Sequence, residues 1–166
     1  MIILGIDPGY AIVGYGVINY SGNHFEVINY GAVTTEASMD FTDRLMTIYD
    51  SISDIIVKYS PEYMSVEKLF FNNNSKTAID VSQARGVILL SARKNNVKVF
   101  EYTPLQVKQA VVGYGRAEKR QVMEMTRILL NLSQIPKPDD TADALAVAIC
   151  HAHSSGSLMN TFTGRV

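Results

Sequence analysis

Four acidic residues stand where their side chains could meet and hold metal ions. Asp7 ends the apolar segment IILGID, and Glu67 stands late in the segment YMSVEK. Asp140 and Asp143, in PDDTADAL, are three residues apart, a spacing that places both on one face of a helical turn. Each acid also has a simpler interpretation. Asp7 could form a turn, Glu67 could point to water from an edge strand, and the last two could complement a helix dipole.

The combination of the four acids favours a metal site. Unit charges about 5 Å apart repel by roughly 3 kcal/mol at an effective dielectric of 20, so four carboxylates in one pocket need cations. Hard oxygen ligands select Mg²⁺, for which Mn²⁺ can substitute, and two such ions roughly 4 Å apart suit in-line hydrolysis of a phosphodiester. We therefore predict that the same four residues are both the metal ligands and the catalytic residues: Asp7, Glu67, Asp140 and Asp143.

Apolar periodicity predicts the elements that must position these acids. Alternation of apolar and polar residues predicts five strands, over residues 2–7, 12–20, 25–34, 63–68 and 97–102. Helical spacing and capping signals predict five helices, over residues 40–59, 77–94, 104–113, 118–132 and from 139 or 140 to about 151. The order β-β-β-α-β-α-β-α-α-α predicts an α/β fold in which helices flank a mixed five-stranded sheet, with three antiparallel strands followed by β-α crossovers.

Length and composition favour a soluble protein. The 166 residues, of which 47% are hydrophobic, are enough for one domain with a buried core. No apolar run approaches the roughly 20 residues of a membrane span. A single cysteine, Cys150, excludes a disulfide framework and fits a reducing compartment. We therefore expect one cytoplasmic domain over residues 1–166, with a short tail from about residue 155.

The net charge of −1 conceals an uneven distribution. Residues 1–75 contain 3 Lys/Arg and 9 Asp/Glu, whereas residues 76–127 contain 10 Lys/Arg and 4 Asp/Glu. Within the basic segment, Lys108, Arg116, Lys119 and Arg120 surround the motif GYG. These cations could neutralise nucleic-acid phosphates beside the acidic site, although ordinary solvated charge explains them equally well without further information.

Several of these motifs together resemble the RuvC family of Holliday junction resolvases. The resemblance runs from Ile3 to His153 and is carried by LGIDPG followed by GYGVI, VEKLFF, QARGV, FEYTPLQVKQAVVGYGRAEKRQV and DDTADALAVAICHAH. It implies a ribonuclease H-like fold, a homodimer, Mg²⁺, and paired nicks across a four-way DNA junction in homologous recombination and DNA repair. A branch-migration helicase complex of the RuvA/RuvB type is implied as a partner.

The same resemblance assigns roles to individual residues. It places the family's catalytic acids on the four acids named above, although some relatives carry a histidine where this chain has Asp140. Asp139 is an additional acid, which we interpret as the cap of the last helix. The resemblance favours Phe70 as the ring that stacks at the junction centre, and Lys108 and Lys119 as the basic positions. Arg85, in the motif QARG, is the next DNA-binding candidate.

Two further patterns have open interpretations. The predicted helix over residues 77–94 is apolar nearly all round, which indicates either a central buried helix or a second face that packs against another subunit. His151 and His153 stand near the expected end of the last helix, where we interpret them as complements of the helix dipole.

Two rival functions have some support. The segment IDPGYAIVGYG also resembles a phosphate-binding hairpin of actin-like kinases and ATPases, but those enzymes need two lobes, and the length here suits one. A catalytically inactive junction-binding protein is the other rival. It is disfavoured because all four acids are present.

Overall fold

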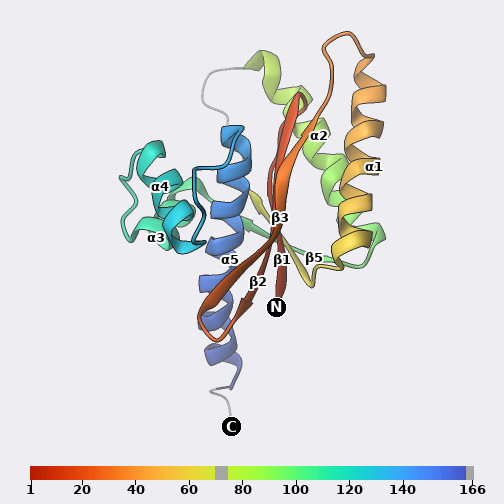
Figure 1. Ribbon diagram of the computed structural model, residues 1–166. Helices are drawn as coiled ribbons and strands as arrows, with labels where there is room; N and C mark the ends of the chain where they lie inside the picture. Colours follow the sequence, from red (N-terminus) through yellow and green to blue (C-terminus); the bar gives the residue numbers. More distant parts are fainter. Residues whose placement is uncertain (70–74, 164–166) are drawn as a thin grey trace.

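A five-stranded mixed sheet forms the centre of the protein (Figure 1). The computed structural model describes residues 1–69 and 75–163, with side chains described for residues 1–69 and 77–155. The strands β1 (Ile2–Asp7), β2 (Ile12–Ser21) and β3 (His24–Thr34) are antiparallel neighbours. The strands β4 (Tyr63–Glu67) and β5 (Lys98–Tyr102) continue the sheet parallel to β1, in the spatial order β3-β2-β1-β4-β5.

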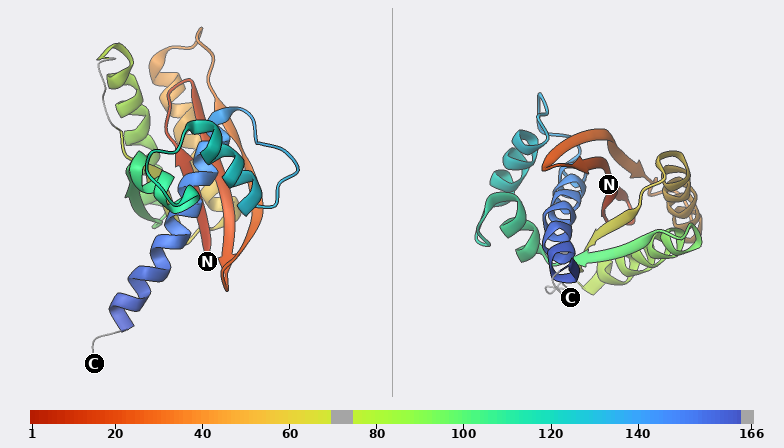
Figure 2. Two further views of the ribbon diagram at one scale, coloured as in Figure 1. Left: turned by 90° about the vertical axis from the view of Figure 1, so that its left-hand side faces the viewer. Right: turned by 90° about the horizontal axis from the view of Figure 1, so that it is seen from below.

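Helices cover both faces of this sheet, as Figure 2 shows from two further sides. On one face lie α1 (Phe41–Tyr59) and α2 (Ser75–Lys94), which also pack against each other. On the other face lies α5 (Asp139–Thr163), and α3 (Pro104–Val112) and α4 (Lys119–Leu129) pack on its outer side. The predicted element order and the mixed sheet are therefore confirmed. None of the helices in the described part of the chain has the length and apolar character needed to cross a membrane.

Alternation along β1 divides the core into two halves. Ile3 packs with Leu145 and Ile149 of α5, whereas Leu4 and Ile6 belong to the cluster on the side of α1 and α2. Because successive side chains of a strand point to opposite faces, Asp7 shares the face of Ile3. The sequence therefore placed the side chain of Asp7 on the face that α5 covers.

Helix α3 starts directly after β5 because its N-terminus is strongly specified. The side chain of Thr103 accepts a hydrogen bond from the backbone N–H of Gln106, and the Gln106 side chain accepts one from the backbone N–H of Thr103. Pro104 occupies the first turn, where its missing N–H costs nothing. Gly113 ends the helix with a φ of 91°, a left-handed conformation that glycine adopts without strain. This start brings Lys108 close to the end of β4.

Helix α5 is longer than the sequence indicated. It continues to Thr163, where the sequence predicted an end near His151 and a tail from about residue 155. The residues after His151 include Gly156 but no proline, and one glycine lowers helix stability by only about 1 kcal/mol. Asp139, which we expected to cap this helix, is its first residue.

Candidate active site

Asp7 and Glu67 are the last residues of two adjacent parallel strands. The register pairs Ile6 with Val66, so the two acids that follow lie side by side at the carboxyl end of β1 and β4. Val66 packs into the core beneath α1 and α2, and the alternation of the strand therefore turns Glu67 to the opposite face. Both carboxylates face α5.

The first turns of α5 bring Asp140 and Asp143 to the same end of the sheet. The hydroxyl of Thr141 donates a hydrogen bond of 3.0 Å to the carbonyl oxygen of Gly31 in β3. The backbone of Asp140 lies directly against Gly14 of β2, and Gly14 is the cross-strand partner of Asp7. The helix that carries two of the acids thus begins beside the strand end that carries the first.

The other three acids are near enough to Asp7 to affect its pKa. Burial is the largest cause of a rise in the pKa of Asp7 to about 8, and the neighbouring Asp143, Glu67 and Asp140 carboxylates contribute the rest of the rise. Burial also raises the pKa of Glu67, to which Asp143 adds, and the pKa of Asp143. The acids that sequence reasoning combined are therefore brought together by the fold.

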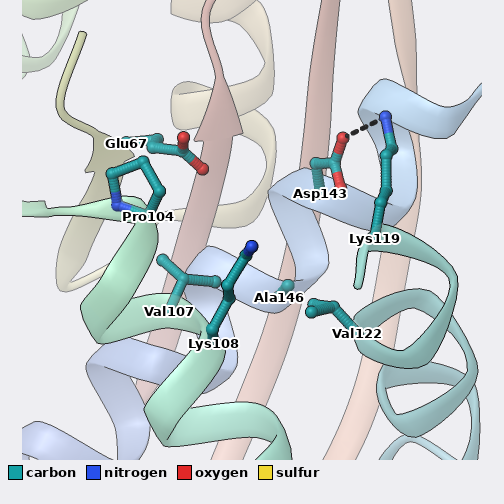
Figure 3. Close-up of a pocket in the computed structure, with 8 residues that line it drawn as sticks. All are labelled: Glu67, Pro104, Val107, Lys108, Lys119, Val122, Asp143 and Ala146. Atoms are coloured by element: carbon teal, nitrogen blue, oxygen red, sulfur yellow. Dashed lines mark ion pairs between the residues drawn. The ribbon is translucent and has the colours of Figure 1, made fainter. Parts of the chain in front are cut away.

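Two lysines line the cleft between these acids. The cleft has a volume of about 200 Å³ and is lined by Glu67, Pro104, Val107, Lys108, Lys119, Val122, Asp143 and Ala146. Figure 3 shows Glu67 and Asp143 on opposite sides, with Lys108 between them and Lys119 directed at Asp143. The Lys119 Nζ is 2.9 Å from Asp143 Oδ2 and 3.6 Å from Asp139 Oδ2. Burial lowers the pKa of Lys119, but the bonds to these two carboxylates outweigh it and leave the pKa above its ordinary value.

The donor set fits a hard divalent cation in its chemistry. All four candidate ligands are carboxylates, and burial together with the neighbouring carboxylates raises the pKa of Asp7, so a cation placed there would favour its ionised form. Among the residues that the structure describes, however, no three His, Cys, Asp or Glu side chains are grouped closely enough to hold an ion. Asp143 is turned toward Lys119 instead. The four candidate ligands would therefore need side-chain rotation to reach one ion.

The other predicted DNA-binding residues lie in different surroundings. Arg85 of α2 forms an ion pair with Glu101 of β5, outside the cleft. Arg116 is exposed in the loop between α3 and α4, and Arg120 lines a separate groove with Tyr114 and Ile128. Phe70 lies outside the described residues. Of the members of this set that the structure describes, only Lys108 and Lys119 line the cleft, beside Glu67 and Asp143.

Sequence reasoning missed two residues that shape this region and misassigned a third residue outside it. Gly14 and Thr141 position the first turn of α5, and the spacing of Gly14 and Gly16 on one face of β2 was the available signal. His151, which we interpreted as a dipole complement, is buried instead, and its Nδ1 lies 2.7 Å from the Tyr102 hydroxyl. Burial lowers the pKa of His151 to about 4, so the ring is neutral and belongs to the core.

A mixed sheet of this order, with acids at two adjacent strand ends and on the helix that crosses them, defines the ribonuclease H-like class of fold. Residues 3–151 match the family model described as "Crossover junction endodeoxyribonuclease RuvC". The chain therefore belongs to the RuvC family of crossover junction endodeoxyribonucleases.

Individual relatives agree with this assignment. The crossover junction endodeoxyribonuclease RuvC of Alkaliphilus oremlandii is 62% identical over 154 residues, which are 93% of this chain and 94% of that protein. The structure of Thermus thermophilus RuvC aligns with a TM-score of 0.89 at 34% identity, covering 95% of this chain and 96% of that one. The same protein in complex with a Holliday junction substrate aligns with a TM-score of 0.87 at 32% identity, with the same coverage.

Proposed function

We propose that this protein is a metal-dependent endonuclease that resolves four-way DNA junctions by paired, symmetric nicks in homologous recombination and DNA repair. The observation that supports this most directly is the cluster of carboxylates at the carboxyl end of β1 and β4, in a chain of the RuvC family. An actin-like phosphotransferase and a catalytically inactive junction-binding protein are both disfavoured, the first by the family match and the second by the retained acids.

The catalytic residues in this proposal are Asp7, Glu67, Asp140 and Asp143, which would hold Mg²⁺ or Mn²⁺. Two such ions, when bound, supply Lewis-acid activation of water and neutralise charge on the scissile phosphate. The chain itself supplies the placement of the ligands. Two come from rigid strand ends and two from the first turns of a helix packed on the sheet, so their relative positions depend on the core.

The cations beside the acids would bind the DNA backbone. Lys108 and Lys119 line the same cleft as Glu67 and Asp143, so a phosphate entering the cleft would meet positive charge on two sides. Arg116 and Arg120 are exposed nearby on the loop and helix that carry Lys119, where they could contact an adjoining arm. Arg85 has Glu101 as its partner, and a role in DNA binding would require it to leave that ion pair.

Paired nicks on opposed strands need two active sites related by a two-fold axis, so we propose a homodimer. We propose that the two subunits contact each other through an exposed face of helix α2. Ile79 is 66% exposed and Leu90 is 51% exposed, at positions that share one face of the helix with Gly86. A Cβ on Gly86 would meet no atom within 4 Å, so this face has room for a close helix–helix contact. The opposite side of α2, with Ala84, Ile88 and Ala92, is buried in the core.

Three further parts of the proposal are supported by the sequence and by family membership. They are a cytoplasmic location, a branch-migration helicase complex as partner, and stacking of Phe70 at the junction centre.

A cleavage assay on a synthetic four-way junction tests the proposal. The wild-type protein should nick two opposed strands in Mg²⁺, and it should not nick them in EDTA or cut a linear duplex of the same sequence. Asp7→Asn, Glu67→Gln and Asp140→Asn should bind the junction and fail to nick it, because phosphate contacts supply the affinity and the acids supply the chemistry. ATP hydrolysis, measured in parallel, tests the actin-like alternative. Nicking by any of the three variants at near wild-type rate would mean that the site is misassigned.

A further inference from the structure

The first three turns of α5 lie close against β1 and β2 where these strands carry glycines instead of side chains. Three glycines form this contact, and the register pairs Gly5 with Gly16 and Gly14 with Asp7. A Cβ on Gly5 would overlap the carbonyl oxygen of Ala144 and lie 2.8 Å from the Cβ of Ala148. Each glycine therefore allows the helix to approach the sheet more closely than any side chain would permit.

The contact at Gly14 differs from the other two because it involves a proposed catalytic residue. A Cβ on Gly14 would overlap the carbonyl group of Asp140 and lie 2.9 Å from the backbone nitrogen of Thr141. Backbone atoms within a helix cannot rotate away as the end of a side chain can. Restoring ordinary contact distances would require the first turn of α5 to move by on the order of 1 Å or more.

The geometry points to Gly14 as a positioning residue of the metal site. It sets the separation between the Asp7 carboxylate and the two carboxylates of α5. Gly14 is opposite Asp7 in the β1–β2 ladder and in contact with Asp140, so the distance between the two ligand-bearing backbones depends on this contact. Ligands of a functional site must be held to within about 0.5 Å, and a displacement of 1 Å can slow a reaction by about 100-fold.

This inference rests on the proposed function, and its test is built on metal binding. Gly14→Ala should weaken Mn²⁺ binding by at least about 10-fold, measured by calorimetry on the DNA-free protein, and slow junction nicking by about 100-fold. Affinity for the four-way junction should change by no more than about twofold, because the phosphate-binding lysines are untouched. A circular dichroism spectrum like that of the wild type would establish that the variant is folded.

Gly16→Ala is the matched control. Its new Cβ would meet mainly the side chain of Leu145, with Cδ2 at 2.5 Å and Cγ at 2.7 Å, whereas the backbone Cα of Leu145 is 3.3 Å away and no backbone atom is overlapped as it is at Gly14. Gly16→Ala should therefore lower the melting temperature while Mn²⁺ affinity stays within about threefold of the wild type. Equal losses of metal affinity in the two alanine variants would overturn the inference, as would wild-type affinity in Gly14→Ala.

A second variant covers the case in which Gly14→Ala does not fold. Thr141→Val keeps the side-chain volume and removes the hydrogen bond from Thr141 to Gly31, which holds the same turn of α5 on the sheet. Folded Thr141→Val should bind Mn²⁺ more weakly by about threefold or more. Wild-type affinity in this variant would then overturn the inference. Failure of the wild type itself to bind Mn²⁺ or nick junctions would instead reject the proposed function.

Discussion

The Lys119 ammonium lies 2.9 Å from the Asp143 carboxylate, so one residue proposed to bind DNA is paired with one proposed to bind metal. The pair joins the first residue of α4 to the second turn of α5. Burial and neighbouring carboxylates raise the pKa values of Asp7 and Glu67, and the positive charge of Lys119 offsets part of that rise. Lys119 therefore supplies part of the positive charge that the acidic cluster needs without metal. If a metal ion took its place at Asp143, Lys119 would be free to contact a phosphate.

Replacing Lys119 by Gln should weaken junction binding and reduce its dependence on salt. One lost phosphate contact lowers the slope of log affinity against log salt by about 1. Lys108→Gln should do the same, because Lys108 lines the same cleft. The measurement is a titration of a fluorescent four-way junction at several salt concentrations.

Arg127→Gln is the control for this titration. Arg127 stands on the same helix as Lys119 but bonds to Glu124, with 2.6 Å between Nη2 and Oε1. Its replacement should leave the salt slope unchanged. If the double variant of Lys108 and Lys119 keeps the affinity and slope of the wild type, the cleft is not a phosphate-binding surface.

Asp7 should make the metal-free protein less stable as the pH rises. Its pKa is about 8 in the folded chain and about 3.9 in an unfolded one, so at neutral pH only the folded state keeps the proton. The stability gained from a raised carboxyl pKa is fully present below the unfolded value and is lost as the pH rises through the folded value. We expect the free energy of unfolding in EDTA to fall by about 1 kcal/mol per pH unit between about pH 6.5 and 8.

Urea denaturation of the wild type and of Asp7→Asn across this range provides the measurement. The free energy of unfolding of the variant should fall less steeply with pH, because only Glu67 and Asp143 then have raised pKa values that lower stability as the pH rises. His151, whose pKa is lowered to about 4 by burial, contributes a slope of the opposite sign near the lower end of the range, because its unfolded-state pKa is about 6.5. That contribution is the same in both proteins and cancels when their slopes are compared. An identical slope in both proteins would refute the assignment to Asp7.

Removing one acid of α5 should stabilise the protein without metal. Asp140→Asn removes repulsion from Asp143, whose pKa Asp140 helps to raise, and should raise the free energy of unfolding in EDTA by on the order of 1 kcal/mol at neutral pH. Asp143→Asn should raise the free energy of unfolding by a smaller amount, because this variant also loses the ion pair with Lys119. Mg²⁺ should raise the melting temperature of the wild type more than that of either variant, since an ion that binds only the folded state stabilises it by mass action.

Thermal melting in EDTA and in Mg²⁺ measures these differences. A wild type that melts above both variants in EDTA would indicate that the acids act mainly on the dipole of α5.

Leu90→Glu should convert the proposed dimer into a folded monomer. Leu90 is 51% exposed on α2, so a charge there can be hydrated in the monomer but would be buried in a helix–helix interface. Sedimentation velocity measures the oligomeric state, and the monomer should fail to make paired nicks. Val57→Glu is the matched control, because Val57 is 68% exposed on the neighbouring α1 and lies outside the proposed interface. A Leu90→Glu protein that remains dimeric would place the interface elsewhere.

Local patterns in the sequence determined most of the fold. The alternation of IILGID settled both the strand β1 and the face of Asp7, because side-chain direction in a strand follows from parity alone. The capping box of Thr103 and Gln106 with Pro104 marked the start of α3, because capping bonds join residues only three apart. The spacing of Asp140 and Asp143 placed both on one helical face for the same local reason.

The tertiary structure decided which distant side chains meet. Nothing near Arg85 in the sequence indicates Glu101 as its partner, and nothing near His151 indicates the hydroxyl of Tyr102. Both contacts depend on how whole helices pack against the sheet. The pairing of Lys119 with Asp143 and the contact of Gly14 with Asp140 arise in the same way. A sequence pattern specifies the direction of a side chain along its own element, but the distance between two elements is set by the volume of everything packed between them.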